Sequence, residues 1–278
     1  MRSTTLSNVT RIEPERGWVL VDLQELWVYK DLIYLLIWRE IKGRYRQMAL
    51  GPLWIVIQPL MQIVVFSLVF GRLAKIPSDG IPYPVFAYTA LLPWQLFATA
   101  VSKSAGSLVA NMNIISKVYF PRMVVPIAAV FAGVIDFSLS FGILLVMMLF
   151  FETYPNLAVV LLPFYLLLGI ATALGVGLWL ASLSVRFRDV SFAITYIVQL
   201  WFYATPVVYP SSLVPEPWLM LYRLNPMAEV IEGFRWALLN RGHAPDGMTG
   251  VVLIEVLVLL VTGAIVFRRT EGSIVDLL

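Results

Sequence analysis

The chain has 278 residues, of which 60% are hydrophobic and 13% charged, with a mean hydropathy of +0.83 and a formal net charge of +3. A charged fraction so far below the roughly 25% of soluble domains excludes an ordinary soluble fold and favours a membrane protein. The absence of cysteine and the single histidine, His243, exclude disulfides and a zinc cluster, and the small, dispersed charge argues against a nucleic-acid surface.

Residues 1–50 form the first predicted region, a cytoplasmic tail that ends in an amphipathic helix. They lack the short basic start, apolar run and small-residue cleavage site of a secretory signal, so we expect them to stay attached. From Asp22 onward, apolar residues recur at helical intervals beside Lys30, Arg39 and Lys42. This pattern predicts a helix that lies in the cytoplasmic interface, with a simple lipid-surface anchor as the alternative.

Six long apolar stretches follow, within a transmembrane domain at residues 51–268. About 20 apolar residues in a helix span roughly 30 Å of hydrocarbon. The backbone there must be helical, because lipid offers no partner for free N–H and C=O groups. The predicted fold class is therefore an all-α membrane protein with six transmembrane helices per subunit. The predicted spans are 52–72, 83–102, 123–151, 158–184, 190–208 and 248–267, followed by a tail at 269–278.

The basic residues predict the orientation of these spans. Most of the 20 Lys and Arg residues fall on one side of the path, in residues 1–50, 102–122 and 185–189 and after residue 267. Positively charged connections stay in the cytoplasm, so both termini are predicted to be cytoplasmic.

The connection between the second and third spans has polar start signals, helix-forming length and a proline stop. These features predict a short cytoplasmic helix at about 103–120. We expect it to expose the aromatic pair Tyr119 and Phe120 beside Lys117, a mixture suited to docking into a groove on a soluble partner. An ordinary basic loop is the alternative.

Between the fifth and sixth spans, prolines divide the outer segment into two pieces, within about 216–241, that are too short to cross. In the second piece Met227 and Phe234 share an apolar face, while Glu232 and Arg235 lie elsewhere. That spacing predicts a helix half buried in the outer interface. Paired half-helices can line a wet cavity and act as a gate, and two surface-lying anchors are the alternative.

The absence of several motifs limits the reactions that this chain could catalyse. The sequence has no G-x-x-x-x-G-K-[ST] motif, so it predicts no P-loop for ATP, and it has no metal-spaced cluster or credible catalytic set. We therefore expect a chain that is not an enzyme. Asp136 and Glu255 lie inside predicted spans, and burying a charge is costly, so each is expected to face the bundle interior, a partner or water. A packing role is the alternative for both.

Five sequence blocks carry a family resemblance. They are Trp38–Tyr45 with Leu50–Trp54 and Gln58–Pro59, then Leu91–Phe97, Ile115–Arg122, Arg186–Asp189 and Leu224–Met227. In this order they resemble the permeases of type-2 ABC exporters that move cell-surface polysaccharides, and the similarity covers roughly residues 30–278. In the tail, Glu271 and Asp276 match the family pattern, whereas Gly272 and Val275 depart from it.

The resemblance implies a six-helix half-transporter that forms a homodimer and associates with two copies of a separate cytoplasmic ATPase. No cofactor would then bind this chain, and ATP and Mg would lie on the ATPase. The implied substrate is a lipid-linked O-antigen-like or teichoic-acid-like polysaccharide, exported across the inner or plasma membrane of a bacterium or archaeon. Two alternatives stay open: an exporter of a small hydrophobic compound, and a membrane enzyme acting on polyprenyl-linked sugars, for which clustered acidic residues are lacking.

The resemblance also assigns residues to roles. The ATPase-coupling residues would be Asn111, Asn113, Ser116, Lys117, Tyr119, Phe120, Arg122, Arg186, Arg188 and Asp189. The interface-helix residues would be Arg39, Glu40, Lys42, Arg44 and Tyr45. The gate residues would be Trp218, Tyr222, Asn225, Pro226, Phe234 and Arg235.

Aromatic side chains are the candidates for the substrate channel, because their faces stack on sugar C–H surfaces without holding a fixed charge. Membrane lipid contacts or plain packing are the alternative for each of them. The candidates are Phe66, Phe70, Trp94, Phe97, Tyr196, Trp201 and Tyr203.

Overall fold

The computed structural model describes residues 23–45, 53–187 and 189–274, and every regular element in these ranges is a helix. The elements in chain order are α1 (Leu23–Val28), α2 (Lys30–Tyr45), α3 (Trp54–Phe66), the π-helix η2 (Ser67–Leu73), α4 (Tyr83–Ala110), α5 (Met112–Ile115), α6 (Val124–Phe150), the 3-10 helix η3 (Leu157–Leu161), α7 (Leu162–Arg186), α8 (Asp189–Tyr203), the 3-10 helix η4 (Ser211–Leu213), α9 (Glu216–Arg223), α10 (Pro226–Leu239) and α11 (Gly247–Ile274).

Within the described residues, five helical stretches are long and apolar enough to cross a membrane. They are Val56–Leu73, Tyr83–Ala110, Val124–Phe150, Leu157–Arg186 and Gly247–Glu271. Each contains most of a predicted span. The remaining predicted span, 190–208, holds α8, whose 15 residues are shorter than the others. At 1.5 Å per residue, α8 extends over about 22 Å.

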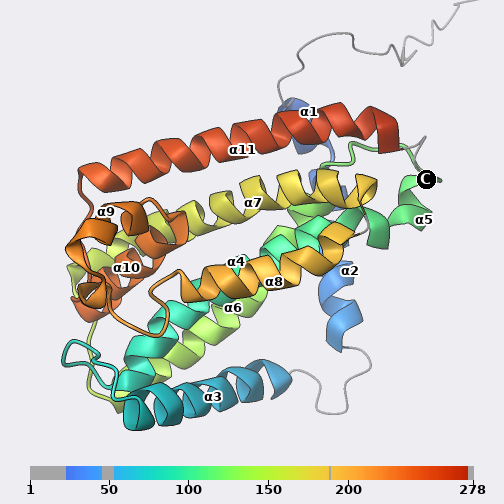
Figure 1. Ribbon diagram of the computed structural model, residues 1–278. Helices are drawn as coiled ribbons and strands as arrows, with labels where there is room; N and C mark the ends of the chain where they lie inside the picture. The colour runs from blue at the N-terminus through green and yellow to red at the C-terminus, as the bar shows by residue number, and fades with distance from the viewer. Residues whose placement is uncertain (1–22, 46–52, 188, 275–278) are drawn as a thin grey trace, which may run out of the picture.

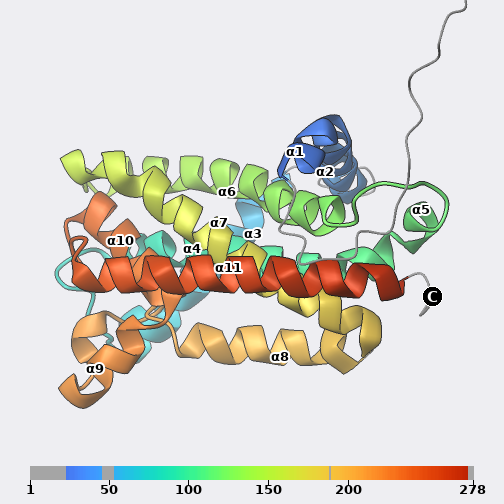
Figure 2. The ribbon, with the colours of Figure 1, turned by 90° about the horizontal axis from the view of Figure 1, so that it is seen from above.

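The long helices lie side by side along one axis of the molecule (Figure 1). Figure 2 shows the same arrangement from above, with α8 parallel to α11 and packed against α4 and α7. α1, α2, α5 and the last described residues gather toward one end, which we name the α5 end. The opposite end holds α9 and α10 and is named the α10 end. α2 crosses the long axis steeply and packs against α6.

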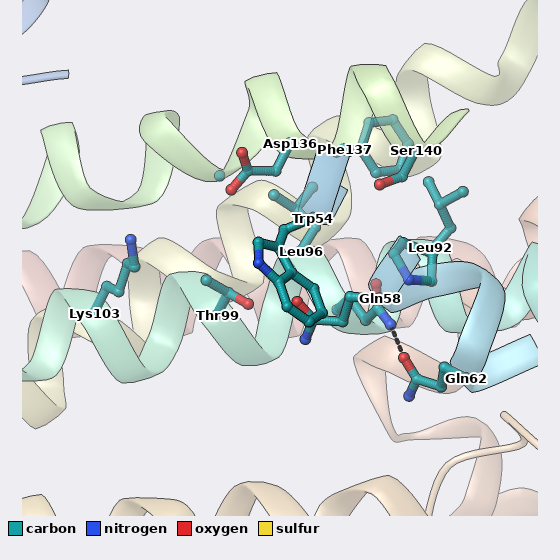
Figure 3. Close-up of a pocket in the computed structure, with 13 residues that line it drawn as sticks. Trp54, Gln58, Gln62, Leu92, Leu96, Thr99, Lys103, Asp136, Phe137 and Ser140 are labelled. Carbon is teal, nitrogen blue, oxygen red and sulfur yellow. Dashed lines mark hydrogen bonds between the residues drawn. The ribbon is translucent and has the colours of Figure 1, made fainter. Parts of the chain in front are cut away.

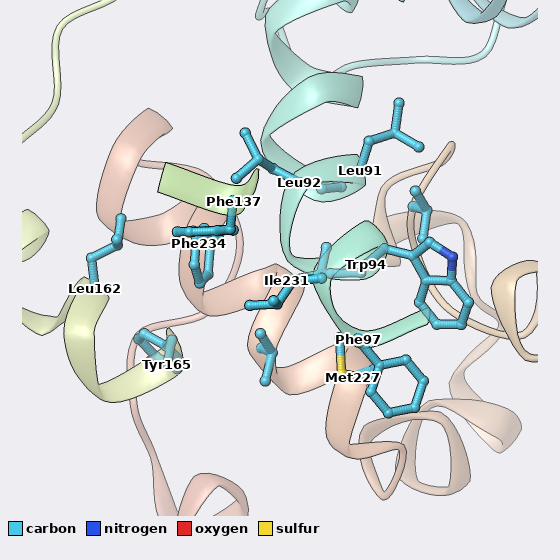
Figure 4. Close-up of a cluster of buried hydrophobic side chains, with 14 of the residues drawn as sticks. Leu91, Leu92, Trp94, Phe97, Phe137, Leu162, Tyr165, Met227, Ile231 and Phe234 are labelled. Carbon is cyan, nitrogen blue, oxygen red and sulfur yellow. The ribbon is translucent and has the colours of Figure 1, made fainter. Parts of the chain in front are cut away.

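α4 is the central helix of the bundle, packed by α6, α7 and α10, and α11 covers the far side of α7. Leu91, Trp94 and Phe97 of α4 meet Phe137 of α6 and Phe234 of α10 in the main apolar cluster (Figure 4). Lipid tails are as apolar as these side chains, so close van der Waals contact rather than escape from water holds such a cluster together within a membrane.

Small residues let α7 and α11 approach closely. A Cβ atom added at Gly263 would lie 2.6 Å from the carbonyl oxygen of Gly175. One added at Gly175 would lie 3.0 Å from the backbone nitrogen of Leu260. The two backbones are therefore in contact at a crossing that accepts only glycine, as is common between membrane helices.

The structure divides the predicted 103–120 helix differently. α4 continues to Ala110, and only the four residues of α5 form a separate helix. Lys103 does not end α4, because its ammonium group forms an ion pair with Glu40 Oε1 at 2.6 Å while Ser104 and Leu108 beyond it are buried. α11 likewise continues past the predicted end of the last span, to Ile274.

Candidate functional site

Ion pairs attach α1 and α2 to the ends of much later helices. Glu25 Oε2 of α1 lies 2.6 Å from the guanidinium group of Arg268 near the end of α11. Glu40 of α2 pairs with Lys103 of α4 over the same distance. All four side chains are partly shielded from solvent, which makes such pairs more persistent than fully exposed ones. The α5 end is therefore one connected surface rather than a set of separate loops.

The predicted interface-helix residues take part in this surface. Arg39 donates a hydrogen bond to the side-chain carbonyl of Asn111, which joins α2 to the residue between α4 and α5. The Lys42 ammonium group lies 5.3 Å from the centre of the Trp38 ring. The side chains of Arg44 and Tyr45 lie outside the described part of the structure.

α1 and α2 present two different faces. Leu36 and Ile41 are buried against the bundle. Trp27, Tyr34 and Trp38 are exposed, at 72%, 68% and 46% of their surface. Aromatic side chains beside lysines are typical of a membrane–water interface. The interfacial position of α1 and α2 stays a prediction.

α5 and the connection from α5 to α6 expose four of the residues predicted for ATPase coupling. Asn113, Ser116 and Lys117 are exposed, and Tyr119 is 77% exposed. Phe120, which we expected on the surface beside Tyr119, is instead buried, at 5% exposed. Its ring packs into a small apolar cluster under the connection, so it anchors this segment and cannot contact a partner.

Arg122 attaches the start of α6 to the end of α11. Its backbone N–H donates to Glu271 Oε1 at 2.8 Å, and its guanidinium group donates to the Glu271 carbonyl oxygen. The second predicted coupling segment lies where α7 meets α8. Arg186 is exposed and lies over the Phe187 ring, 5.5 Å from its centre, and Asp189 is the exposed first residue of α8, while Arg188 lies outside the described residues.

The structure brings five of the predicted channel aromatics together through one residue that the sequence analysis missed. Phe202 of α8 contacts Phe66 of α3 at 6.1 Å and Trp94 of α4 at 5.6 Å between ring centres. Phe97 meets Trp201 edge to face at 4.9 Å. Phe70 of η2 stacks on Phe66 at 5.3 Å, and the Trp94 and Phe97 rings lie 5.4 Å apart, so the contacts form one chain of rings across α3, η2, α4 and α8. We name this chain of six rings the aromatic cluster.

The other two channel candidates lie at or beyond the exposed margin of the aromatic cluster, where the Tyr203 ring meets the Phe202 ring edge to face at 5.4 Å between ring centres. Tyr196 and Tyr203 lie on α8 and are 69% and 58% exposed. They belong to a face of α8 that no other described element covers.

Asn225 joins the end of α8 to the start of α10. Its side-chain carbonyl accepts from the Trp201 indole N–H at 2.9 Å and from the Met227 backbone N–H at 3.1 Å. Its amide group donates to Thr205 Oγ1 at 2.9 Å. One amide therefore caps α10 and fixes the orientation of an aromatic-cluster residue.

α10 lies deeper than the sequence indicated. We expected it half buried in the outer interface, but its polar face is buried as well, with Glu229, Glu232 and Arg235 at 4%, 6% and 1% exposed. Phe234 on the other face packs edge to face on Phe137. Surface-lying anchors are therefore excluded for α10, whereas α9 exposes most of its side chains.

Arg235 is buried together with partners for its charge. Its guanidinium group lies 3.2 Å from Glu232 Oε1 and 3.8 Å from the centre of the Phe86 ring. It also donates to the carbonyl oxygens of Val207 at 3.0 Å and Tyr209 at 3.3 Å. A buried cation persists only with such compensation, so Arg235 holds the segment after α8 against α10 and α4.

Two further polar contacts close the α10 end. Arg223 at the end of α9 lies 2.6 Å from Asp246, and Asp246 caps α11 by accepting from the backbone N–H groups of Met248 and Thr249. The hydrogen bond from Arg223 holds the pKa of Asp246 below its usual value. Thr249 donates to Glu229 Oε1 at 2.6 Å, which connects α11 to α10.

A cavity of about 560 Å³ lies among α8, α9, α10 and α11. It brings together Trp201, Glu255 and four of the predicted gate residues, which are Trp218, Tyr222, Asn225 and Pro226. The other two, Phe234 and Arg235, lie in the core instead. Glu255 thus faces a cavity, as expected for a carboxylate within a span.

The comparisons with known proteins agree with this architecture. A profile of the ABC-2 type transporter family matches residues 31–239, from the start of α2 to the end of α10. The O-antigen export system permease protein RfbA of Myxococcus xanthus is 32% identical over 245 residues, which cover 87% of this chain and 93% of that protein. The chain belongs to the ABC-2 type transporter family.

Other relatives are similar over nearly their full lengths. An RfbA protein of Klebsiella pneumoniae is 28% identical over 89% of this chain and 95% of its own length. The polysialic acid transport protein KpsM of Escherichia coli is 23% identical over 88% of this chain and 96% of its own length. This ABC-2 transporter chain is thus a multi-pass membrane permease of the transport-subunit type, not an ATPase.

Sequence reasoning missed several residues of this ABC-2 transporter site. Phe202 stands between two residues that were selected, and its role depends on which side of α8 faces α3 and α4. Phe86 and Thr249 carried no signal, since each acts on a charged side chain far away in the sequence. One feature of the sequence could have indicated the buried ion pair: Arg235 and Glu232 stand three residues apart on a helix with an apolar face.

Proposed function

We propose that this chain is the membrane subunit of an ATP-driven exporter that moves a lipid-linked cell-surface polysaccharide out of the cytoplasm. The observation that carries the proposal is the similarity, over most of the chain, to permeases named for O-antigen export and polysialic acid transport. The aromatic cluster supports it, because stacked rings offer a sugar polymer weak contacts without a fixed charge.

A separate ABC ATPase would supply the energy, with ATP and Mg bound there. Its docking surface on this chain would be the exposed connection after α5, which offers Lys117 and Tyr119, together with Arg186 and Asp189 at the α7–α8 turn. Movement of the ATPase against this connection would be transmitted to the helix bundle through the buried ring of Phe120 and through the Arg122–Glu271 contact. Movement of the partner would then be converted into movement of α6 and α11.

Six spans with both termini in the cytoplasm complete the proposal. α8 runs along the bundle axis like the five long helices, and the residues after Tyr203 extend its path toward the α10 end. The α5 end carries the basic connections, which the positive-inside rule places in the cytoplasm. α9 and α10 would then lie at the outer end as a gate above the aromatic cluster.

The functional unit would be a homodimer with two ATPase copies. The uncovered face of α8, with Tyr196 and Tyr203, is available for a second copy. Two such halves would enclose the polymer path between them, and nucleotide-driven movement of the halves would open it.

The experiment uses the chain purified with a candidate ABC ATPase from the same genome and measures ATP hydrolysis stimulated by lipid-linked glycan. Lys117→Glu with Tyr119→Ala should reduce both complex formation and stimulated hydrolysis by at least about tenfold, because it replaces the charge and an exposed aromatic contact. The matched control is Lys75→Glu with Tyr154→Ala, which alters exposed residues outside the α5-end connection and should leave both unchanged. Transport of polysaccharide by the chain alone in vesicles would contradict the proposal, and stimulation by small hydrophobic compounds but not by glycan would favour the alternative exporter.

A further inference from the structure

A second cavity, of about 480 Å³, lies between α3, α4 and α6 (Figure 3). α3 lines it with Trp54, Gln58 and Gln62, which stand four residues apart and therefore share one helix face. We name this cavity the polar groove.

The other two helices present matching polar strips. α4 contributes Gln95, Thr99 and Lys103, again four residues apart, and α6 contributes Asp136 and Ser140. Figure 3 shows the α4 and α6 side chains facing each other across the space that Trp54 and Gln58 enter. A spacing of four on all three helices places every strip along the same groove rather than at scattered points.

The polar groove covers about half of a bilayer. From Lys103 to Leu92, which also lines it, α4 rises about 16 Å, against roughly 30 Å of hydrocarbon. It starts at the α5 end, where the Lys103 ammonium group pairs with Glu40. A molecule in the adjoining leaflet could therefore enter it from the headgroup region.

Side chains of this kind are expensive inside a membrane unless they meet polar partners. Gln95 donates to Gln62 across the groove, which satisfies only part of the bonding capacity of two amides. The remaining donors and acceptors face a cavity, and a cavity of this size in a polar setting needs a polar occupant.

The residues that line the groove also indicate the chemical class of the molecule that occupies it. The charged residues that line the groove are one carboxylate, Asp136, and one ammonium group, Lys103, so the charges of the lining cancel and select neither an anion nor a cation. Amides and hydroxyls both donate and accept, which matches the hydroxyl groups of a sugar. The Trp54 ring adds a flat apolar surface for sugar C–H groups.

We propose that the polar groove binds a hexosyl unit of a lipid-linked glycan in the leaflet next to the α5 end. This inference rests on the proposed function and adds a sugar-binding site apart from the aromatic cluster. Amide and hydroxyl groups can each donate or accept a hydrogen bond, so the groove does not require one arrangement of sugar hydroxyls and accepts more than one hexose.

The absence of cysteine from the chain permits a test with single introduced thiols. Thr99→Cys places a thiol in the groove, and the matched control Ser102→Cys places one on the exposed face of the same helix. The full chain is placed in nanodiscs of phosphatidylglycerol, with or without glucosyl- or galactosyl-diacylglycerol. The measurement is the rate of reaction with a small water-soluble thiol reagent.

Either glycolipid should slow labelling of Thr99→Cys about tenfold when present at about ten times its Kd, while labelling of Ser102→Cys stays unchanged. Adding Gln58→Leu and Gln62→Leu should abolish the protection. Equal rates with and without glycolipid would overturn the inference and indicate a groove filled only with water or ordinary headgroups. Protection that survives loss of both amides would overturn it as well.

The inference and the proposed function fail separately. Glycan-stimulated ATP hydrolysis without protection of Thr99→Cys would contradict the groove and leave the exporter proposal standing. Protection in a chain that moves no polysaccharide with any ATPase would support a glycolipid site and contradict the exporter proposal.

Discussion

At the scale of single residues, burial of charge decides how the α10 end is built. Arg235 and Glu232 stand three residues apart on α10, and neither could be buried alone at acceptable cost. The sequence predicts their shared helix and their separation from the apolar face. Their burial could not be predicted, because it depends on the carbonyl oxygens of Val207 and Tyr209 and on the Phe86 ring, which the fold brings from elsewhere.

Arg235→Met should lower the free energy of unfolding by about 3 kcal/mol, because it leaves the Glu232 carboxylate buried without its partner. Adding Glu232→Gln should recover part of that loss, since the buried charge is then removed as well. Denaturant titration of the purified chain in mild detergent measures both effects, with the exposed Arg241→Met as the control. Equal stability of Arg235→Met and the native chain would contradict this account of the pair.

Asp246→Asn removes the carboxylate charge but keeps the N-cap of α11, because asparagine also caps helix N-termini well. The Asp246 pKa is lowered in the folded chain, so the carboxylate stabilises the fold above its unfolded pKa, and this contribution is lost as the pH falls through the folded pKa. The variant should therefore melt below the native chain at pH 7, and the difference should shrink below about pH 4. A difference in melting temperature that is independent of pH would contradict the role of the charge.

At the scale of helices, hydropathy predicts the long elements well and their ends poorly. Val124–Phe150 lies within one residue of the predicted span at each end, because apolar content alone defines it. α4 runs eight residues past its predicted end, since Lys103 is neutralised by Glu40, a partner that local sequence does not reveal. The short helices α9 and α10 lie within the predicted segment 216–241 and are separated at a proline, Pro226, but how deeply each is buried depends on packing.

Gly263→Ala should weaken the crossing of α7 and α11. The added Cβ would lie 2.6 Å from the Gly175 carbonyl oxygen, so the backbones must separate, at a cost of about 1–3 kcal/mol in the free energy of unfolding. Gly250→Ala on the same helix is the matched control, because its Cβ would meet nothing within 4 Å. Similar stabilities of the two variants would show that the helices are not in close contact there.

At the scale of the whole molecule, the path of α8 decides the topology. A thiol at Ser191, near the start of α8, and one at Ser212, after its end, should react from opposite faces of the membrane if α8 crosses it. Sided labelling of Ser191→Cys and Ser212→Cys in oriented vesicles measures this, and both side chains are exposed. Reaction of both from the same face would leave five spans and place α8 on the surface.

The candidate site could be predicted from the sequence only in part. Sequence identifies which residue types gather at each end of the bundle: Lys117 and Tyr119 are exposed at the α5 end, and Asn225 lines the cavity at the α10 end. It does not identify which rings touch, because the rings of the aromatic cluster come from α3, η2, α4 and α8, whose rotation is set by packing. Phe202, which the sequence did not single out, links the rings of α3 and α4.

The contact between Glu25 and Arg268 also bears on how the protein is made. Its two partners are 243 residues apart in the chain. At about 5–20 residues per second, translation of the second follows that of the first by on the order of ten to fifty seconds. During synthesis, Glu25 of α1 therefore lacks its ion-pair partner Arg268 until the final helix has been translated.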